Sequence, residues 1–185
     1  MEAILMFLNK YIYNTEILVP MIVAIIGFVG VMFQMNSAKN VSSAGYDLEL
    51  QNSFVNNSGF SELFLFCWNT YNGNNYKNYQ SITDIDNYET VLYSYFTFFE
   101  SIYLMNKKAV IKMSLLDDLF GRRFFVVVNC KEVQDLELRV NEKYYNNIFE
   151  LYKKWKKYRI KKGNKDLTID IIKNSKRPNC FVELV

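Results

Sequence analysis

The clearest pattern in the chain is an uninterrupted apolar run near its N-terminus. Ile17 to Met35 contain no charged residue and a single polar side chain, Gln34. At about 1.5 Å per residue in a helix, this stretch matches the ~30 Å hydrocarbon core of a bilayer. We therefore predict one transmembrane helix over 17–35. Two alternatives are a buried helix of a soluble protein and a signal peptide cleaved near Ser42–Ala44.

Behind this run, apolar residues recur at the spacing of amphipathic helices. We expect a loop at 71–81, and helices at 46–56, 60–70, 83–106, 115–128 and 133–159. Leu48, Phe54 and Val55 are expected core contacts of the first helix. Asp86 to Glu89 have the spacing of a capping box with Asp in place of Ser. For Val126–Val128 a short strand is the alternative to a helix.

The fold class that follows is mainly α: one N-terminal transmembrane helix and a helical-bundle soluble domain. Only 7 glycines and 2 prolines occur in 185 residues, which favours long helices over a turn-rich β fold. We divide the chain into an extramembrane segment 1–16, the transmembrane helix 17–35, a linker 36–45, a helical domain 46–165 and a C-terminal tail 166–185.

The cysteines favour a reducing compartment for the C-terminal domain. There are 3, with wide spacing and no CxxC pair, and the chain has no histidine. A zinc site of the Cys/His type and a disulfide framework are therefore not expected. Lys10 and Lys39 flank the membrane segment equally, so charge next to the membrane does not set its orientation. The thiols and the lysine-rich C-terminal half favour a cytoplasmic C-terminal domain.

The absence of histidine also rules out Ser-His-Asp and Cys-His nucleophiles, and no P-loop or GxGxxG turn is present. Carboxylates remain as candidate chemistry. Asp117, Asp118 and Glu132, with Lys131, would be the metal site of a membrane-tethered nuclease. We favour the alternative that these acids begin helices, where the helix dipole stabilises them. No enzyme activity, metal or cofactor is therefore expected.

Two groups of basic residues are the candidate binding sites. Eight lie between 153 and 165, and Lys153, Lys154, Lys157 and Lys161 among them share one helix face. This face suits anionic lipid, nucleic acid or a charged nucleotide, or is simply solvated. Arg122 and Arg123 suit a phosphate or carboxylate, and the alternatives are that they are solvated or that they pair with Asp117 and Asp118.

Small residues also repeat within the predicted membrane helix. Ala24, Gly27 and Gly30 follow one another at a spacing of three. Such a track lets two helices approach closely in a bilayer. We take these residues as the candidate packing face of a homo-oligomer.

Several stretches together resemble a known family. A lone N-terminal membrane helix leads into YDLELQNSF (46–54), a helix ending FFESIYLMNKK (98–108) and LLDDLFGRRFFVVVNCKEVQ (115–134). This order is similar to an uncharacterised bacterial family of small single-pass membrane proteins with a helical cytoplasmic domain. The resemblance covers about 17–155 and implies the bacterial inner membrane and no enzyme activity. The architecture also resembles membrane effectors of antiviral defence systems, a likeness of shape alone.

The function expected from the sequence is that of a non-enzymatic, membrane-anchored sensor or effector, oligomeric and acting in antiviral defence. Its helical domain would bind a protein partner or an anionic nucleotide, and the membrane helix would respond. One alternative is a passive anchor subunit that recruits a partner protein to the bilayer. The nuclease is the other.

Overall fold

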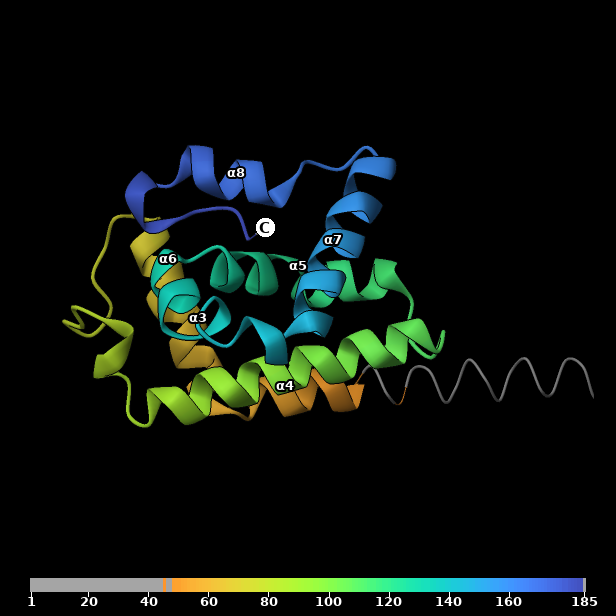
Figure 1. Cartoon of the computed structure of the whole chain (residues 1–185), viewed down its shortest axis with the longest axis horizontal. Helices are drawn as coiled ribbons and strands as arrows, with labels where there is room; N and C mark the ends of the chain where they lie inside the picture. Colours follow the sequence, from red (N-terminus) through yellow and green to blue (C-terminus); the bar gives the residue numbers. More distant parts are fainter. Residues whose placement is uncertain (1–44, 46–47, 185) are drawn as a thin grey trace, which may run out of the picture. The chain divides into compact units, whose positions relative to one another are not determined.

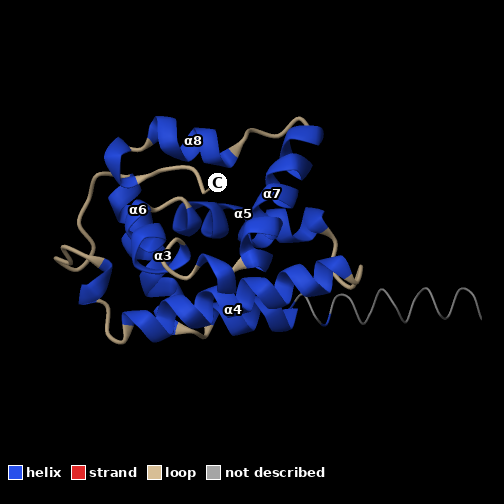
Figure 2. Cartoon of the chain, in the orientation of Figure 1, coloured by secondary structure: helices blue, strands red, loops and turns tan. Residues whose placement is uncertain are grey.

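The computed structural model describes residues 45 and 48–184. Within this part the chain is mainly helical, and its single β feature is one antiparallel bridge between Cys130 and Phe181. Figure 2 shows helices joined by loops throughout the described residues. The helical-bundle class expected for the domain is confirmed. The predicted transmembrane segment 17–35 lies outside the described residues.

The described elements follow the order expected up to residue 133. A helical segment spans 48–55. The α-helices are α3 (Ser58–Tyr71), α4 (Tyr88–Lys107), α5 (Met113–Val128), α6 (Lys131–Val133), α7 (Asn146–Lys161) and α8 (Leu167–Asn174). Shorter turns are η1 (Ile82–Asp84), the π-helical η2 (Gln134–Leu138), η3 (Glu142–Tyr144) and η4 (Pro178–Cys180). The loop expected at 71–81 is found between α3 and η1.

The core is built from aromatic rings supplied by successive helices. Phe54 of the segment 48–55 packs against Phe99 of α4 and Phe120 of α5, with ring centroids 6.4 and 5.5 Å away. Phe124 of α5 then stacks on Trp155 of α7 at 5.1 Å. Figure 1 shows α4 and α8 at opposite edges of this domain with α5 between them. The buried residues of α4, among them Tyr95, Phe99 and Ile102, recur at helical spacing and so form one face of that helix.

The prediction of one long helix over 133–159 is wrong, because the helix is interrupted between η2, which ends at Leu138, and α7, which begins at Asn146. Tyr145 turns inward, places its ring 5.3 Å from that of Phe96 and donates a 2.5 Å hydrogen bond to Glu137 Oε1. Val140 and Tyr144 lie on the apolar period of the helix predicted over 133–159, yet both are exposed. Burial of Tyr145 therefore shifts the helical phase by one residue, and the backbone absorbs the shift in a π-helical turn and a 3₁₀ turn.

Residues 166–185, predicted as a C-terminal tail, contribute a helix and buried side chains to the domain. Residues 167–174 form α8, and Phe181 and Leu184 are almost fully buried in the core. Tyr71 of α3 meets Phe181 edge-on at 6.1 Å, so the last described residues complete the same core as α3.

Two local expectations fail, at the core contacts of the first helix and at the capping box, whereas the helix predicted over 115–128 is found. Leu48 and Val55 are exposed, whereas Phe54 is buried as expected. The helix at 126–128 replaces the strand alternative, since α5 runs through all three valines. The capping box lies at Ser81 and Asp84 of η1, while Asn87 before α4 adopts a left-handed conformation and makes no side-chain cap.

Candidate functional site

A basic groove lies between α7 and the C-terminal segment 181–184. Its volume is about 350 Å³. We call it the basic groove, and it is lined by Tyr152, Lys153, Lys156, Lys157, Ile160, Glu183 and Leu184. The lysines stand on one side of α7 because the opposite side buries Leu151 and Trp155. Amphipathic packing of α7 therefore places positive charge along the groove.

The charges of the basic groove are unequally neutralised. Lys156 pairs with Glu183 and, at 3.5 Å, with Asp166. Desolvation opposes the charge of Lys156, but the hydrogen bond to Glu183 and the nearby Asp166 outweigh it and raise its pKa. Lys153 has only Glu150 at 3.8 Å, with both side chains largely exposed, and Lys157 has no ion pair among residues 48–184. The residues that line the groove include three lysines and one carboxylate, Glu183, so the lining carries a net positive charge.

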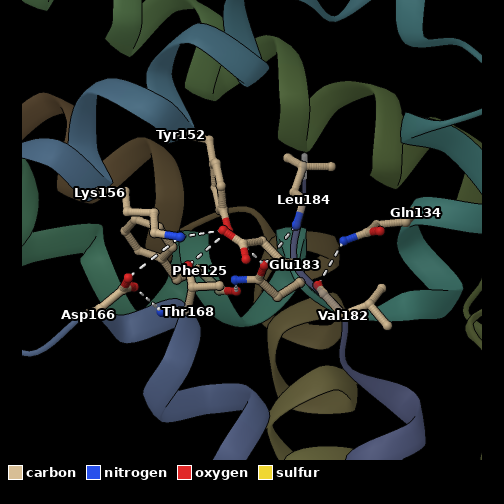
Figure 3. Close-up of polar contacts among 10 residues, drawn as sticks. Phe125, Gln134, Tyr152, Lys156, Asp166, Thr168, Val182, Glu183 and Leu184 are labelled. Atoms are coloured by element: carbon tan, nitrogen blue, oxygen red, sulfur yellow. Dashed lines mark hydrogen bonds and ion pairs between the residues drawn. The ribbon is translucent and has the colours of Figure 1, made fainter.

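A buried polar network holds the floor of the basic groove in place (Figure 3). The Tyr152 hydroxyl lies 3.2 Å from Asn129 Oδ1 and 2.9 Å from Thr168 Oγ1. The backbone N–H of Leu184 donates to the same Asn129 oxygen at 3.2 Å. Asn129 Nδ2 donates in turn to the carbonyl of Phe125 at 2.8 Å. Four separate segments are joined here, and burial of Tyr152 raises its pKa, so the hydroxyl stays protonated.

A second contact fixes the C-terminal segment beside this network. The side-chain amide of Gln134 donates to the carbonyls of Val128, at 2.8 Å, and Val182, at 3.0 Å. The backbone N–H of Val182 donates to the carbonyl of Asn129 at 2.9 Å. The wall that carries Glu183 is therefore held by main-chain and side-chain hydrogen bonds on both of its sides.

The structure brings together only part of the predicted basic face. Lys153 and Lys157 line the basic groove, whereas Lys154 and Lys161 do not. Lys154 donates a 2.7 Å hydrogen bond to Asn106 Oδ1 at the end of α4. Lys161 is exposed at the last residue of α7. The predicted packing residues Ala24, Gly27 and Gly30 lie outside the described residues.

Arg122 and Arg123 lie against aromatic rings. The guanidinium carbon of Arg122 is 5.0 Å from the ring of Trp68, and that of Arg123 is 4.7 Å from the ring of Phe54. Neither arginine lines the basic groove. The alternative of pairing with Asp117 and Asp118 is not found, because Asp117 binds Arg159. Cation–π contact explains these two positions without a ligand.

The acids proposed for a nuclease site are engaged separately. Asp117 accepts hydrogen bonds from Arg159 and from the Trp155 indole. Glu132 accepts from the backbone of Ile82 and from the Ser81 hydroxyl. In the part of the chain that the structure describes, no three Asp, Glu or Cys side chains are grouped to hold a metal ion.

A second cavity, of about 340 Å³, opens between α3, the loop 72–81, η2 and η4. Its charged residues have partners within the domain: Lys131 pairs with Asp135, and Arg177 donates to Asn75 Oδ1 at 2.7 Å. Cys130 and Cys180 line it as free thiols, and Cys67 is free and buried. The lining of this cavity has two basic and two acidic residues, whereas the lining of the basic groove has three lysines and one glutamate.

The sequence did not predict the residues that form the basic groove around Lys153 and Lys157. Tyr152, Asn129, Thr168 and Glu183 were not candidates. Their one signal in the sequence is that Asn129 directly follows the apolar run Val126–Val128, where an amide is costly unless it is hydrogen-bonded.

Comparisons with protein-family models, with curated proteins and with solved structures found no match for this chain. Among the described residues, no helix combines the length and the apolar character needed to cross a bilayer.

Proposed function

We propose that this protein is a non-enzymatic, membrane-anchored sensor or effector whose helical domain binds an anionic group in the basic groove. Ile17–Met35 would form the anchor, because this run alone has the length and polarity of a membrane helix. Binding in the domain would change how the membrane helices pack, through Ala24, Gly27 and Gly30. Antiviral defence is the setting that the architecture suggests.

The observation that supports this proposal is the net positive charge of the groove lining, where three lysines face one carboxylate. Lys153 and Lys157 flank a concave surface whose other walls are Tyr152, Ile160 and Leu184. Ammonium groups above an apolar floor attract phosphate and carboxylate groups, and the low-dielectric walls strengthen that attraction. Glu183 adds specificity, since a ligand has to approach the lysines while avoiding this carboxylate.

The test is polyanion binding to the full-length protein in a mild detergent, with inorganic tripolyphosphate as the probe. Titration calorimetry should show binding that weakens as salt is raised, because both partners are charged. The double variant K153E/K157E should lose this binding. The control K107E/K108E changes net charge equally at a different place and should keep it. Equal loss in both variants would show that only net charge matters, and would overturn the groove assignment.

The effector role needs its own measurement. Native mass spectrometry of the detergent-solubilised protein should give a defined oligomer rather than a monomer. Replacement of 17–35 with an unrelated membrane helix should abolish its effect on membrane potential in cells, followed with a potential-sensitive dye. A monomeric protein that keeps its effect after 17–35 is replaced would contradict the effector role.

A passive anchor subunit is the second candidate, and one observation favours it. Tyr93, Val140 and Tyr144 are large apolar or aromatic side chains that remain mostly exposed. Exposed aromatic residues are frequent where proteins dock. This candidate predicts that replacing 17–35 is harmless, while Tyr144→Glu prevents recruitment of the partner.

A further inference from the structure

The turn that connects α4 to α5 carries exposed lysines and exposed apolar side chains together. We call it the α4–α5 corner, and its residues are Leu104, Lys107, Lys108, Val110, Lys112 and Lys154. Leu104 is 45% exposed and Val110 38% exposed, and all four lysines are exposed. Lys154 belongs to α7 and reaches the corner through its hydrogen bond to Asn106.

The α4–α5 corner is held in a fixed conformation. The N–H of Lys108 donates to the carbonyl of Leu104 at 3.0 Å, and that of Val110 donates to the carbonyl of Met105 at 2.9 Å. The amide of Asn106 donates to the carbonyl of Ile111 at 2.8 Å. Ile111 is buried, so it anchors the turn while its neighbour Val110 points outward. The exposed side chains are therefore presented by a structured turn.

The charge of the corner is of one sign. Residues 101–116 include three lysines and no Asp or Glu. Lys107, Lys108 and Lys112 have no ion pair within the described residues. Basic side chains around exposed Leu and Val are the composition of surfaces that bind anionic lipid, where each lysine adds attraction and apolar tips enter the interface.

The position of the corner in the domain fits the same partner. Figure 1 shows the segment 48–55, drawn in orange, beside α4. Phe54 of that segment contacts Phe98 of α4 at 5.6 Å. The first described segment of the domain therefore packs on the helix that ends at the corner. Residues 36–47 precede it, and a fully extended chain of that length reaches only about 40 Å from the end of the proposed anchor.

We infer that the α4–α5 corner is a lipid-contacting surface that rests on anionic headgroups, with Leu104 and Val110 in the interface. This rests on the proposed membrane anchoring of the chain. The occupant is a bilayer surface, because a hydrogen-bonded turn that exposes apolar side chains together with unpaired lysines fits a plane of anionic headgroups. The basic groove and the second cavity are lined by residues outside the corner.

The test compares lysine reactivity in the full chain reconstituted into two kinds of nanodisc. One holds neutral phosphatidylcholine, and the other contains anionic phosphatidylglycerol as well. Acetylation by a water-soluble reagent, read by mass spectrometry, should be about fivefold slower at Lys107, Lys108 and Lys112 in the anionic discs. Exposed Lys173 of α8 serves as the internal reference. In K107E/K108E the protection of Lys112 should disappear, and in K153E/K157E it should persist.

The outcomes separate this inference from the anchoring on which it rests. A chain that alkaline carbonate strips from cell membranes is not integral, and the proposed function would then fail. A chain that is retained, with lysines equally reactive in both discs, would overturn the lipid surface alone. Protection by added RNA in neutral discs, with none from anionic lipid, would likewise overturn it and assign the corner to nucleic acid.

Discussion

The carboxylate of Asp117 accepts hydrogen bonds from Nη1 of Arg159 at 2.6 Å through both of its oxygens, and so joins α5 to α7. The Trp155 indole donates to the same carboxylate at 2.8 Å. The side chains of Asp117 and Arg159 are only 7% and 14% exposed. A Cβ at Gly121 would come within 2.9 Å of Asp117 Oδ1, so glycine makes room for the pair.

Loss of this pair should destabilise the domain. Asp117→Asn leaves the Arg159 cation without its counter-charge in a mostly buried place, which should cost about 3 kcal/mol of unfolding free energy. Chemical denaturation in detergent measures it. Asp118 is exposed, so Asp118→Asn should leave stability unchanged. The nuclease alternative instead predicts that both variants remain folded and lose metal-dependent cleavage.

Asn129 should control how firmly the C-terminal segment is held. Its side chain bonds Tyr152, Phe125 and Leu184 together. Asn129→Ala leaves these buried groups unpaired, and we expect a loss of about 2 kcal/mol. Hydrogen exchange at the amides of Val182 and Leu184 should accelerate more than exchange in α4. Asn174→Ala removes only an exposed contact within α8 and should not change exchange at these amides.

The ionised forms of Glu62 and Glu100 should change the free energy of unfolding in opposite directions. The hydrogen bond from Lys77 lowers the pKa of Glu62 below 4.5, so its stabilisation is present above that pH and is lost as pH falls through the folded-state pKa. Burial raises the pKa of Glu100, so its ionised form opposes folding at neutral pH. Glu62→Gln should lower unfolding free energy at pH 7, and Glu100→Gln should raise it. Both differences should shrink as pH falls toward 3, which denaturation at a series of pH values measures.

Ala109 holds a backbone conformation that suits glycine. Its φ is 56°, in the left-handed region, where an L-residue costs about 1 kcal/mol. Ala109→Gly should therefore stabilise the domain by roughly that amount, less the entropy that glycine adds to the unfolded chain. Ser101→Gly lies in the helical backbone of α4 and should destabilise. A thermal melt that ranks the two variants in the reverse order would contradict the strain at Ala109.

The sequence predicted the elements whose pattern is local. The stripe from Leu92 to Ile102 repeats regularly, and α4 follows it. The break after Leu138 could not be predicted this way, because the period continues through Val140 and Tyr144. What decides the break is Phe96, a partner distant in sequence that buries Tyr145 instead. Periodicity describes one helix face, whereas the phase shift depends on a contact between two helices.

The sequence predicted the positive charge of the site but not its concave shape. Lys153 and Lys157 stand out in any count of basic residues, and both line the basic groove. The concave shape comes from Glu183 and Leu184, in a stretch that reads as a tail. Their position depends on Asn129 and Gln134, single polar residues within apolar surroundings. Such residues have no pattern, so the shape of the site became visible only in three dimensions.

The burial of Phe181 and Leu184 has a consequence for the newly made protein. Phe181 reaches back to Tyr71, and Leu184 to Asn129, so the core stays open until the last of these residues has left the ribosome. Contacts between residues so far apart in sequence form late and slowly. The apolar surfaces that Phe181 and Leu184 cover are meanwhile exposed during synthesis, a condition that favours aggregation and the binding of chaperones. The proposed membrane anchor 17–35 would be made, and ready to insert, long before the domain behind it can fold.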